Sequence, residues 1–146
     1  MTFSESVKLC LGPKYLFKFA GRAPRSEFWW FMLFIFLVNI GAGFVFTLFP
    51  PLFSASLSLI LSLILLPANL GVTVRRFHDR NLSGWWLLLP SGLLAVWILA
   101  GGPAQQPGLI TSAISLAVCV CYLAILCSPS QPGPNKYGQP PTLALP

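Results

Sequence analysis

The sequence predicts an all-α fold: a polytopic membrane protein, built as a four-transmembrane-helix bundle with an N-terminal interfacial helical segment. The first observation is composition, because charged residues make up only 8% of the 146 residues and hydrophobic residues 55%. Soluble domains carry about 25% charged residues. The second observation is that charge-free stretches of spanning or near-spanning length recur along the chain. With a mean hydropathy of +0.77, these observations exclude an ordinary soluble enzyme and a disordered chain.

The predicted elements follow in order. Residues 1–27 are expected to form a cytoplasmic interfacial segment. The apolar run that begins at Phe28 has no small-residue cleavage pattern after it, so it is expected to be an uncleaved anchor. Spans are predicted at about 28–48, 52–74, 83–100 and 109–127, since a crossing needs about 20 apolar residues. The connection Phe49–Pro50–Pro51 predicts an antiparallel hairpin of the first two spans. Residues 128–146 are expected to form a Pro-rich cytoplasmic tail.

The positions of the basic residues predict the orientation. Five of the nine precede the first span, three lie between the second and third spans, and one follows the fourth. The other two connections contain none. Short loops rich in Lys and Arg stay in the cytoplasm, so both termini are expected there. The basic residues then set orientation and contact anionic lipid, and nucleic acid is not expected as a partner.

Small residues recur within the predicted spans. We interpret two stripes as helix contacts, because small side chains let helices approach closely; a polar track for a substrate is the other interpretation. Pro67 and Pro90 are expected to kink their spans. No charged residue lies within a span, which argues against an ion pathway. The stripes are Ser54, Ser58 and Ser62 on the second span, and Ala113, Ala117 and Cys121 on the fourth.

Three polar motifs are predicted to face the cytoplasm. Residues 21–30 enter the first span, residues 75–86 join the second span to the third, and residues 133–138 follow the fourth. Each places charge beside aromatic residues, as is typical of a membrane–water interface. Such a belt does not explain Glu27 and Asp79, two of the three carboxylates in the chain, because anionic lipid repels them.

These two carboxylates are interpreted as ion-pair partners, with two arrangements open. If the second helix continues past Val74, Asp79 can reach Arg75 or Arg76 on the same helix. Alternatively, Asp79 pairs with an arginine of the first motif, Arg22 or Arg25, and Glu27 pairs with Arg75 or Arg76. The second arrangement would latch the first motif to the second.

The three motifs in combination resemble a bacterial inner-membrane family, domain of unknown function 805, the YhaH-like proteins. The resemblance covers roughly Val7 to Gly138 and implies a small multi-span protein of the inner membrane; it implies no established activity. The chain departs from the family at Phe77, at Arg80–Asn81–Leu82 and in a tail without the family's acidic residue. The residues that carry the resemblance are Gly21–Arg22–x–x–Arg25–x–Glu27–Phe28–Trp29, then Arg76–x–His78–Asp79 and Ser83–Gly84–Trp85–Trp86, then Asn135–x–Tyr137–Gly138.

A non-catalytic function is predicted. His78, Asp79 and Ser83 have the residue types of a hydrolase triad, but adjacent His and Asp side chains point apart on a helix. No cofactor is expected, and no metal, since the four cysteines lack the spacing of zinc sites. We expect the cytoplasmic cluster to bind anionic lipid headgroups or a protein partner, with homo-oligomers left open; the alternative is an oligomeric transporter or pore. The candidate residues, for binding or for a structural latch, are Arg22, Arg25, Glu27, Trp29, Arg75, Arg76, His78, Asp79, Trp85, Trp86, Asn135 and Tyr137.

Overall fold

A computed structural model describes residues 1–99 and 108–141 of the chain. Within these ranges the protein is all-α and has no β-strand beyond one isolated bridge in the tail, so the predicted fold class is confirmed at that level. The elements are α1 (Phe3–Leu11), α2 (Arg25–Phe46), α3 (Pro51–Asp79), the short 3₁₀ helix η1 (Gly84–Leu87), α4 (Leu88–Leu99) and α5 (Leu109–Cys127).

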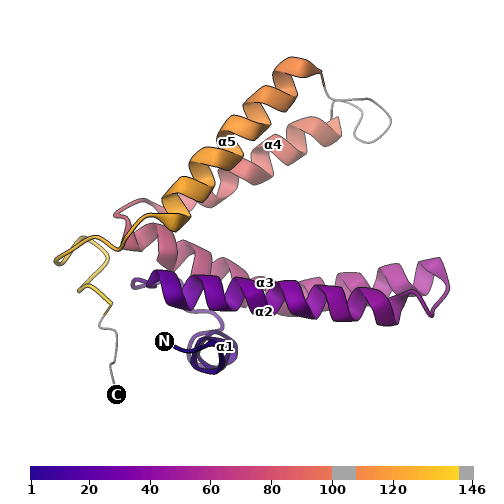
Figure 1. Ribbon diagram of the computed structural model, residues 1–146, viewed down its shortest axis with the longest axis horizontal. Helices are drawn as coiled ribbons and strands as arrows, with labels where there is room; N and C mark the ends of the chain where they lie inside the picture. The colour runs from indigo at the N-terminus through magenta and orange to yellow at the C-terminus, as the bar shows by residue number, and fades with distance from the viewer. Residues whose placement is uncertain (100–107, 142–146) are drawn as a thin grey trace.

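The helices form two hairpins that diverge from one end of the molecule (Figure 1). The first consists of α2 and α3, which run side by side, and the second of α4 and α5. The turn between α2 and α3 is tight because Pro51 is the first residue of α3, where its missing N–H breaks no helical bond. The hairpin predicted from the Pro50–Pro51 pair is therefore confirmed.

Three helices are long and apolar enough to cross a membrane: α2 with 22 residues, α3 with 29 and α5 with 19. The stretch predicted as the third span divides into η1 and a twelve-residue α4, and residues 100–107 lie outside the described residues. A fourth span therefore stays a prediction. Pro90 is the third residue of α4, in the first turn, where a proline removes no hydrogen bond of that helix. A proline at this position gives no reason to expect a kink in α4.

Helix α1 crosses the first hairpin near the end where the two hairpins meet, and it is seen end-on beside α2 in Figure 1. A capping box starts it: the Thr2 hydroxyl accepts from the Glu5 N–H, and the Glu5 carboxylate accepts from the Thr2 N–H. Its buried residues, Ser6 and Cys10, face α2, since the Ser6 hydroxyl donates to the Glu27 carbonyl over 2.6 Å. The predicted interfacial segment thus contains a helix over its first third.

Helix α3 extends five residues beyond the predicted span end at Val74, so the second polar motif is helical as far as Asp79. It stops at a left-handed residue, Asn81, with φ of 60°. The Leu82 N–H then bonds to the Phe77 carbonyl and the Asn81 N–H to the His78 carbonyl, which is the Schellman pattern. Asparagine tolerates this conformation better than most residues, which accounts for a turn without glycine here.

The buried core lies at the end where the hairpins meet, and it contains Phe28, Phe31, Val72, Phe77 and Leu126. Farther along the helices most apolar side chains are exposed, as expected for surfaces that a bilayer covers.

Among residues 1–99 and 108–141, the small-residue stripes do not make the predicted helix contacts. Ser58 and Ser62 are exposed, and their hydroxyls donate to carbonyls of α3 itself, at Ser54 and Ser58. The stripe of Ala113, Ala117 and Cys121 is exposed as well. A serine that bonds four residues back satisfies its own hydroxyl, so no neighbouring helix is needed to do so.

Candidate functional site

The three polar motifs meet at one place, here called the polar end: residues 21–27, residues 75–80 and residues 126–138. They come from the N-terminus of α2, the C-terminus of α3, and the C-terminus of α5 with the tail that follows. Burial here is unusual, because Arg75, Arg76 and Asp79 are at most 2% exposed. Charged side chains are rarely buried unless they are paired.

Asp79 receives a guanidinium on each carboxylate oxygen. Arg22 Nε lies 2.9 Å from Oδ1, and Arg76 Nη1 lies 2.6 Å from Oδ2. Arg76 is on the same helix, whereas Arg22 comes from the first motif. Both pairings that the sequence left open for Asp79 therefore occur together.

Glu27 forms the second bridge between the motifs. Its Oε1 lies 2.7 Å from Arg75 Nη2, and both side chains are nearly fully buried. Arg75 Nη1 also donates to the Lys18 carbonyl over 2.7 Å. Gly71 permits this approach, because a Cβ there would lie 3.3 Å from the Lys18 carbonyl oxygen. The Glu27–Arg75 pair thus joins α2 to α3 and fixes the loop before α2.

Arg76 and Arg25 also hold the C-terminus of α5. Arg76 Nε and Nη2 donate to the Leu126 carbonyl over 3.1 and 3.0 Å, and Nη2 also bonds to the Ser128 carbonyl. Arg25 donates to the Cys127 carbonyl over 3.3 Å. The last carbonyls of a helix lack partners within it and carry partial negative charge, so arginines suit this position.

The tail after α5 is also held by arginines that donate to main-chain carbonyls. Arg22 Nη1 donates to the Gly133 carbonyl over 2.7 Å and Nη2 to the Gln131 carbonyl over 2.6 Å. Arg80 donates to the Pro129 carbonyl over 2.6 Å. Arg22 therefore binds Asp79 and the tail at once, and each of its three guanidinium nitrogens donates a hydrogen bond.

His78, Asn135 and Tyr137 form a further contact between α3 and the tail. The His78 and Tyr137 rings stack with centroids 3.7 Å apart and planes at 7°. Asn135 Nδ2 donates to the His78 carbonyl over 2.9 Å, and its Oδ1 accepts from the Tyr137 N–H. Gly84 packs nearby, since a Cβ there would be 2.9 Å from Val74.

The hydrolase residue types do not form a hydrogen-bonded line in the described structure. His78 Nδ1 faces the Gly21 carbonyl at 3.2 Å, whereas Asp79 is occupied by arginines. The Ser83 hydroxyl accepts from the Trp85 N–H at the start of η1. These groups serve the local structure.

Most predicted site residues are brought together here, but four stand apart from the buried cluster. The tryptophans are exposed, at 40% for Trp29, 77% for Trp85 and 45% for Trp86. Arg25 is exposed too, and its hydrogen bond in the described part of the chain goes to the Cys127 carbonyl at the end of α5. The cluster proper consists of Arg22, Glu27, Arg75, Arg76, His78, Asp79, Asn135 and Tyr137.

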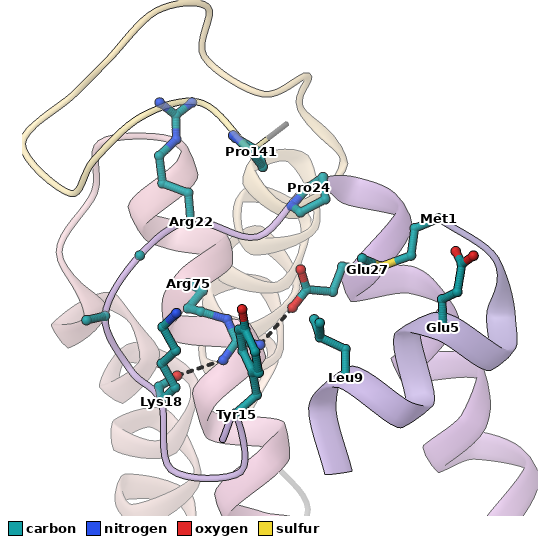
Figure 2. A pocket seen from close by; sticks show the side chains of 12 residues that line it. Met1, Glu5, Leu9, Tyr15, Lys18, Arg22, Pro24, Glu27, Arg75 and Pro141 are labelled. Atoms are coloured by element: carbon teal, nitrogen blue, oxygen red, sulfur yellow. Dashed lines mark hydrogen bonds and ion pairs between the residues drawn. The ribbon is translucent and has the colours of Figure 1, made fainter. Parts of the chain in front are cut away.

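A cavity of about 410 Å³ beside the cluster was not predicted. Figure 2 shows Tyr15 and Lys18 side by side on one wall, with Glu27 bonded to Arg75 beside them and α1 opposite. Lys18 Nζ lies 4.5 Å from the centroid of the Tyr15 ring, and Arg75 Cζ lies 5.5 Å from it. The signal was present in the sequence as two lysines among three aromatic residues over 14–19.

Comparison with known proteins supplies the family. The family described as "Protein of unknown function (DUF805)" matches residues 16–139. The chain belongs to this family. It is 32% identical over 137 residues to the "Uncharacterized protein YiiR" of Escherichia coli (strain K12), covering 86% of this chain and 87% of that protein.

A second relative is the "Inner membrane protein YhaI" of the same organism, 27% identical over 126 residues, which is 84% of this chain and 85% of YhaI. No solved structure matches the DUF805 chain. The resemblance recognised from the motifs is thereby confirmed. An inner-membrane relative and three apolar helices of spanning length agree on a membrane protein.

Proposed function

We propose that this DUF805 protein is a non-catalytic protein of the bacterial inner membrane that binds anionic lipid headgroups at its cytoplasmic face. The observation that carries the proposal is the segment Lys14–Phe19: Tyr15 and Lys18 line the cavity of about 410 Å³, and the same segment exposes a second lysine and two phenylalanines. The buried arginines serve a different purpose: they hold the two hairpins together. Headgroup binding is therefore assigned to the cations that this cluster leaves free.

The chemistry of this segment suits a lipid surface. Phe17 is 68% exposed and Phe19 43%, so both rings leave a large part of their apolar surface uncovered by the chain. Lys14 and Lys18 both lie close to Tyr15, with Nζ atoms 5.9 and 4.5 Å from its ring centroid. Each basic residue near an anionic membrane contributes about 1 kcal/mol of attraction, and exposed aromatic rings enter the interface.

The cytoplasmic orientation rests on the distribution of basic residues. A probe cysteine at Gln105 should react with an impermeant reagent from outside the cell, and one at Lys136 should react only after the membrane is opened. Lys136 is exposed on the tail. Native Cys10 is unsuitable as the internal probe, because burial, aided by the charge of Glu27, raises the pKa of its thiol to about 12. The opposite labelling pattern would place this face outside.

Native mass spectrometry in mild detergent tests the binding function. The variant Lys14→Gln/Lys18→Gln should retain less phosphatidylglycerol than the wild type. Lys8→Gln/Lys136→Gln is the matched control, because it removes the same charge from exposed positions that do not line the cavity. Equal retention by the wild type and both variants would overturn the proposal. A co-purifying protein in place of lipid would favour the partner-binding function.

A further inference from the structure

We propose a second, separate lipid site: the pocket between the N-terminus of α2 and the C-terminus of α5 binds the phosphate group of a membrane phospholipid. The pocket has a volume of about 400 Å³ and is lined by Arg25, Ser26, Trp29, Trp30 and Cys127. The inference deepens the proposed function and rests on it for the lipid nature of the ligand. It is spatially distinct, because the two cavities share no lining residue.

Arg25 differs from the other arginines of the first two motifs. Arg22, Arg75 and Arg76 each pair with a carboxylate, whereas Arg25 is exposed and makes one hydrogen bond of 3.3 Å within the described chain. Arg80 also lacks a carboxylate partner in the described residues, but its hydrogen bond to the Pro129 carbonyl is shorter, at 2.6 Å, and it does not line this pocket. A guanidinium has five N–H donors in a planar fork that fits phosphate. Donors of Arg25 therefore remain available on the wall of this pocket.

The charge around the pocket favours an anion. Arg22 and Arg76 share the single carboxylate of Asp79, so this pair of guanidiniums keeps one net positive charge. Arg25 itself pairs with no carboxylate in the described residues. A phosphate oxygen at the pocket would offset positive charge that the chain leaves uncompensated.

Ser26 supplies a second donor that lacks a partner. Its Oγ is buried and makes no hydrogen bond in the part of the chain that the structure describes. Buried hydroxyls are nearly always bonded, so this hydroxyl is a donor without an acceptor in a residue that lines the pocket. Pro24 is the N-cap of α2, and no side chain caps this terminus. The first N–H groups of a helix attract phosphate, and Arg25 and Ser26 are the first two residues of α2.

The tryptophans indicate that the ligand is amphiphilic rather than a free anion. Trp29 and Trp30 are 40% and 38% exposed on the pocket wall, one turn inside α2. Indole rings favour the headgroup level of a bilayer, where one edge is wet and the face is apolar. A phospholipid places its phosphate at the level of Arg25 and its glycerol and upper acyl chain against these rings.

Cys127 provides a direct readout, because its side chain lines the pocket. In the background Cys119→Ala/Cys121→Ala, Cys127 is the accessible thiol, since Cys10 is 1% exposed. The alkylation rate of Cys127 by a maleimide is followed by mass spectrometry in mild detergent, with and without phosphatidylglycerol. At lipid about ten times above Kd, the rate should fall about tenfold, because the unoccupied fraction falls as 1/(1 + [L]/Kd).

Arg25→Gln should reduce this protection to about twofold if Kd rises about tenfold. Arg25→Lys should restore only part of it, since the ammonium cannot bind phosphate through a fork. An unchanged thermal midpoint shows that the variants fold. Protection that is absent in the wild type, or that is equal in Arg25→Gln, overturns the proposal. Inorganic phosphate should give no protection; equal protection by it would show a soluble-anion site instead.

The two lipid proposals fail separately. Lys14→Gln/Lys18→Gln should lose phosphatidylglycerol at the first cavity yet keep the protection of Cys127. If the lysine variant loses lipid while Arg25→Gln leaves Cys127 protection unchanged, the Arg25 pocket is not a lipid site and the proposed function stands. If the lysine variant loses nothing and Arg25→Gln abolishes protection, the Arg25 pocket alone binds lipid.

Discussion

The two helical hairpins are attached to the rest of the molecule by different means. The α2–α3 hairpin has a conventional apolar contact, with Phe28, Phe31, Ala68 and Val72 buried near its polar end, and one ion pair, Glu27–Arg75. The α4–α5 hairpin diverges from it (Figure 1). Apart from contacts such as the Phe77–Tyr122 ring pair, α5 is held by arginines bonded to main-chain carbonyls.

This difference shows where each hairpin is vulnerable. A bilayer covers apolar helix surfaces equally well whether the hairpins are together or apart, so burial of lipid-facing residues does little to hold them. The angle between the hairpins then depends on a few guanidinium groups, and their geometry depends on Asp79. Loss of that carboxylate should release α5 and the tail, whereas loss of Glu27 should disturb α1 and the loop before α2.

The largest effect is expected for Asp79→Asn. The substitution leaves Arg22 and Arg76 buried with uncompensated charge, which costs about 3 to 5 kcal/mol of the free energy of unfolding. The thermal midpoint in mild detergent measures the loss. Arg80→Gln is the control, since it removes a single exposed contact to the Pro129 carbonyl and should cost less than about 1 kcal/mol.

Double-mutant cycles locate the partners of Asp79. Its cycles with Arg22 and with Arg76 should be non-additive by about 1 kcal/mol or more, and its cycle with Arg25 should be additive within about 0.5 kcal/mol. Additive cycles for both Arg22 and Arg76 would contradict the network around Asp79.

Glu27→Gln is expected to lower the free energy of unfolding by about 3 kcal/mol. This loss is smaller than that of Asp79→Asn and affects another part of the molecule. Arg75 would keep its bond to the Lys18 carbonyl, so part of its hydrogen bonding survives. Hydrogen exchange should rise in α1 and in residues 12–24 and stay unchanged in α5. If hydrogen exchange rises in the same segments for Glu27→Gln and Asp79→Asn, the two hairpins are not held by separate ion pairs.

The contact between the tail and α3 is expected to contribute less to the free energy of unfolding than either ion pair. Tyr137→Leu removes the ring stacked on His78, and such ring pairs contribute about 0.5 to 1.5 kcal/mol beyond their buried area. Limited proteolysis should cut residues 129–141 faster, while the thermal midpoint changes little. Lys136→Leu, at the neighbouring exposed position, is the control and should leave the cleavage rate as in the wild type.

Much of this architecture was predictable because it follows from local chemistry. The start of α2 and the end of α5 were within a few residues of prediction, since charged residues precede the first apolar run and serine and proline residues follow the fourth. The sequence also predicted that Glu27 and Asp79 form ion pairs, because the chain has only three carboxylates and these two lie close to arginines. Their partners were not decidable, because the pairing depends on how α3 continues past Val74.

Other features depend on tertiary contacts that no short pattern reveals. The arginines of the motifs were expected to meet lipid, yet Arg76 binds a carbonyl at the end of α5, 50 positions away along the chain, and Arg22 binds one in the tail, 111 positions away. A backbone carbonyl has no signature in a sequence, because every residue has one. The cavity beside Tyr15 arises from the crossing of α1 over α2, which the composition of residues 1–27 does not specify.

The smallest effect is expected where the sequence suggested a contact. Ser58 belongs to the stripe interpreted as a helix interface, and on that interpretation Ser58→Leu would push α3 from its neighbour and lower the thermal midpoint. In the structure Ser58 is exposed and its hydroxyl donates to the Ser54 carbonyl over 2.8 Å. A leucine there meets lipid, so the free energy of unfolding should change by no more than about 0.5 kcal/mol. Val72→Phe is the contrasting variant, because Val72 is fully buried and overpacking costs about 1 to 3 kcal/mol. A fall in the midpoint for Ser58→Leu that matched Val72→Phe would show that a second copy or another chain covers this face of α3.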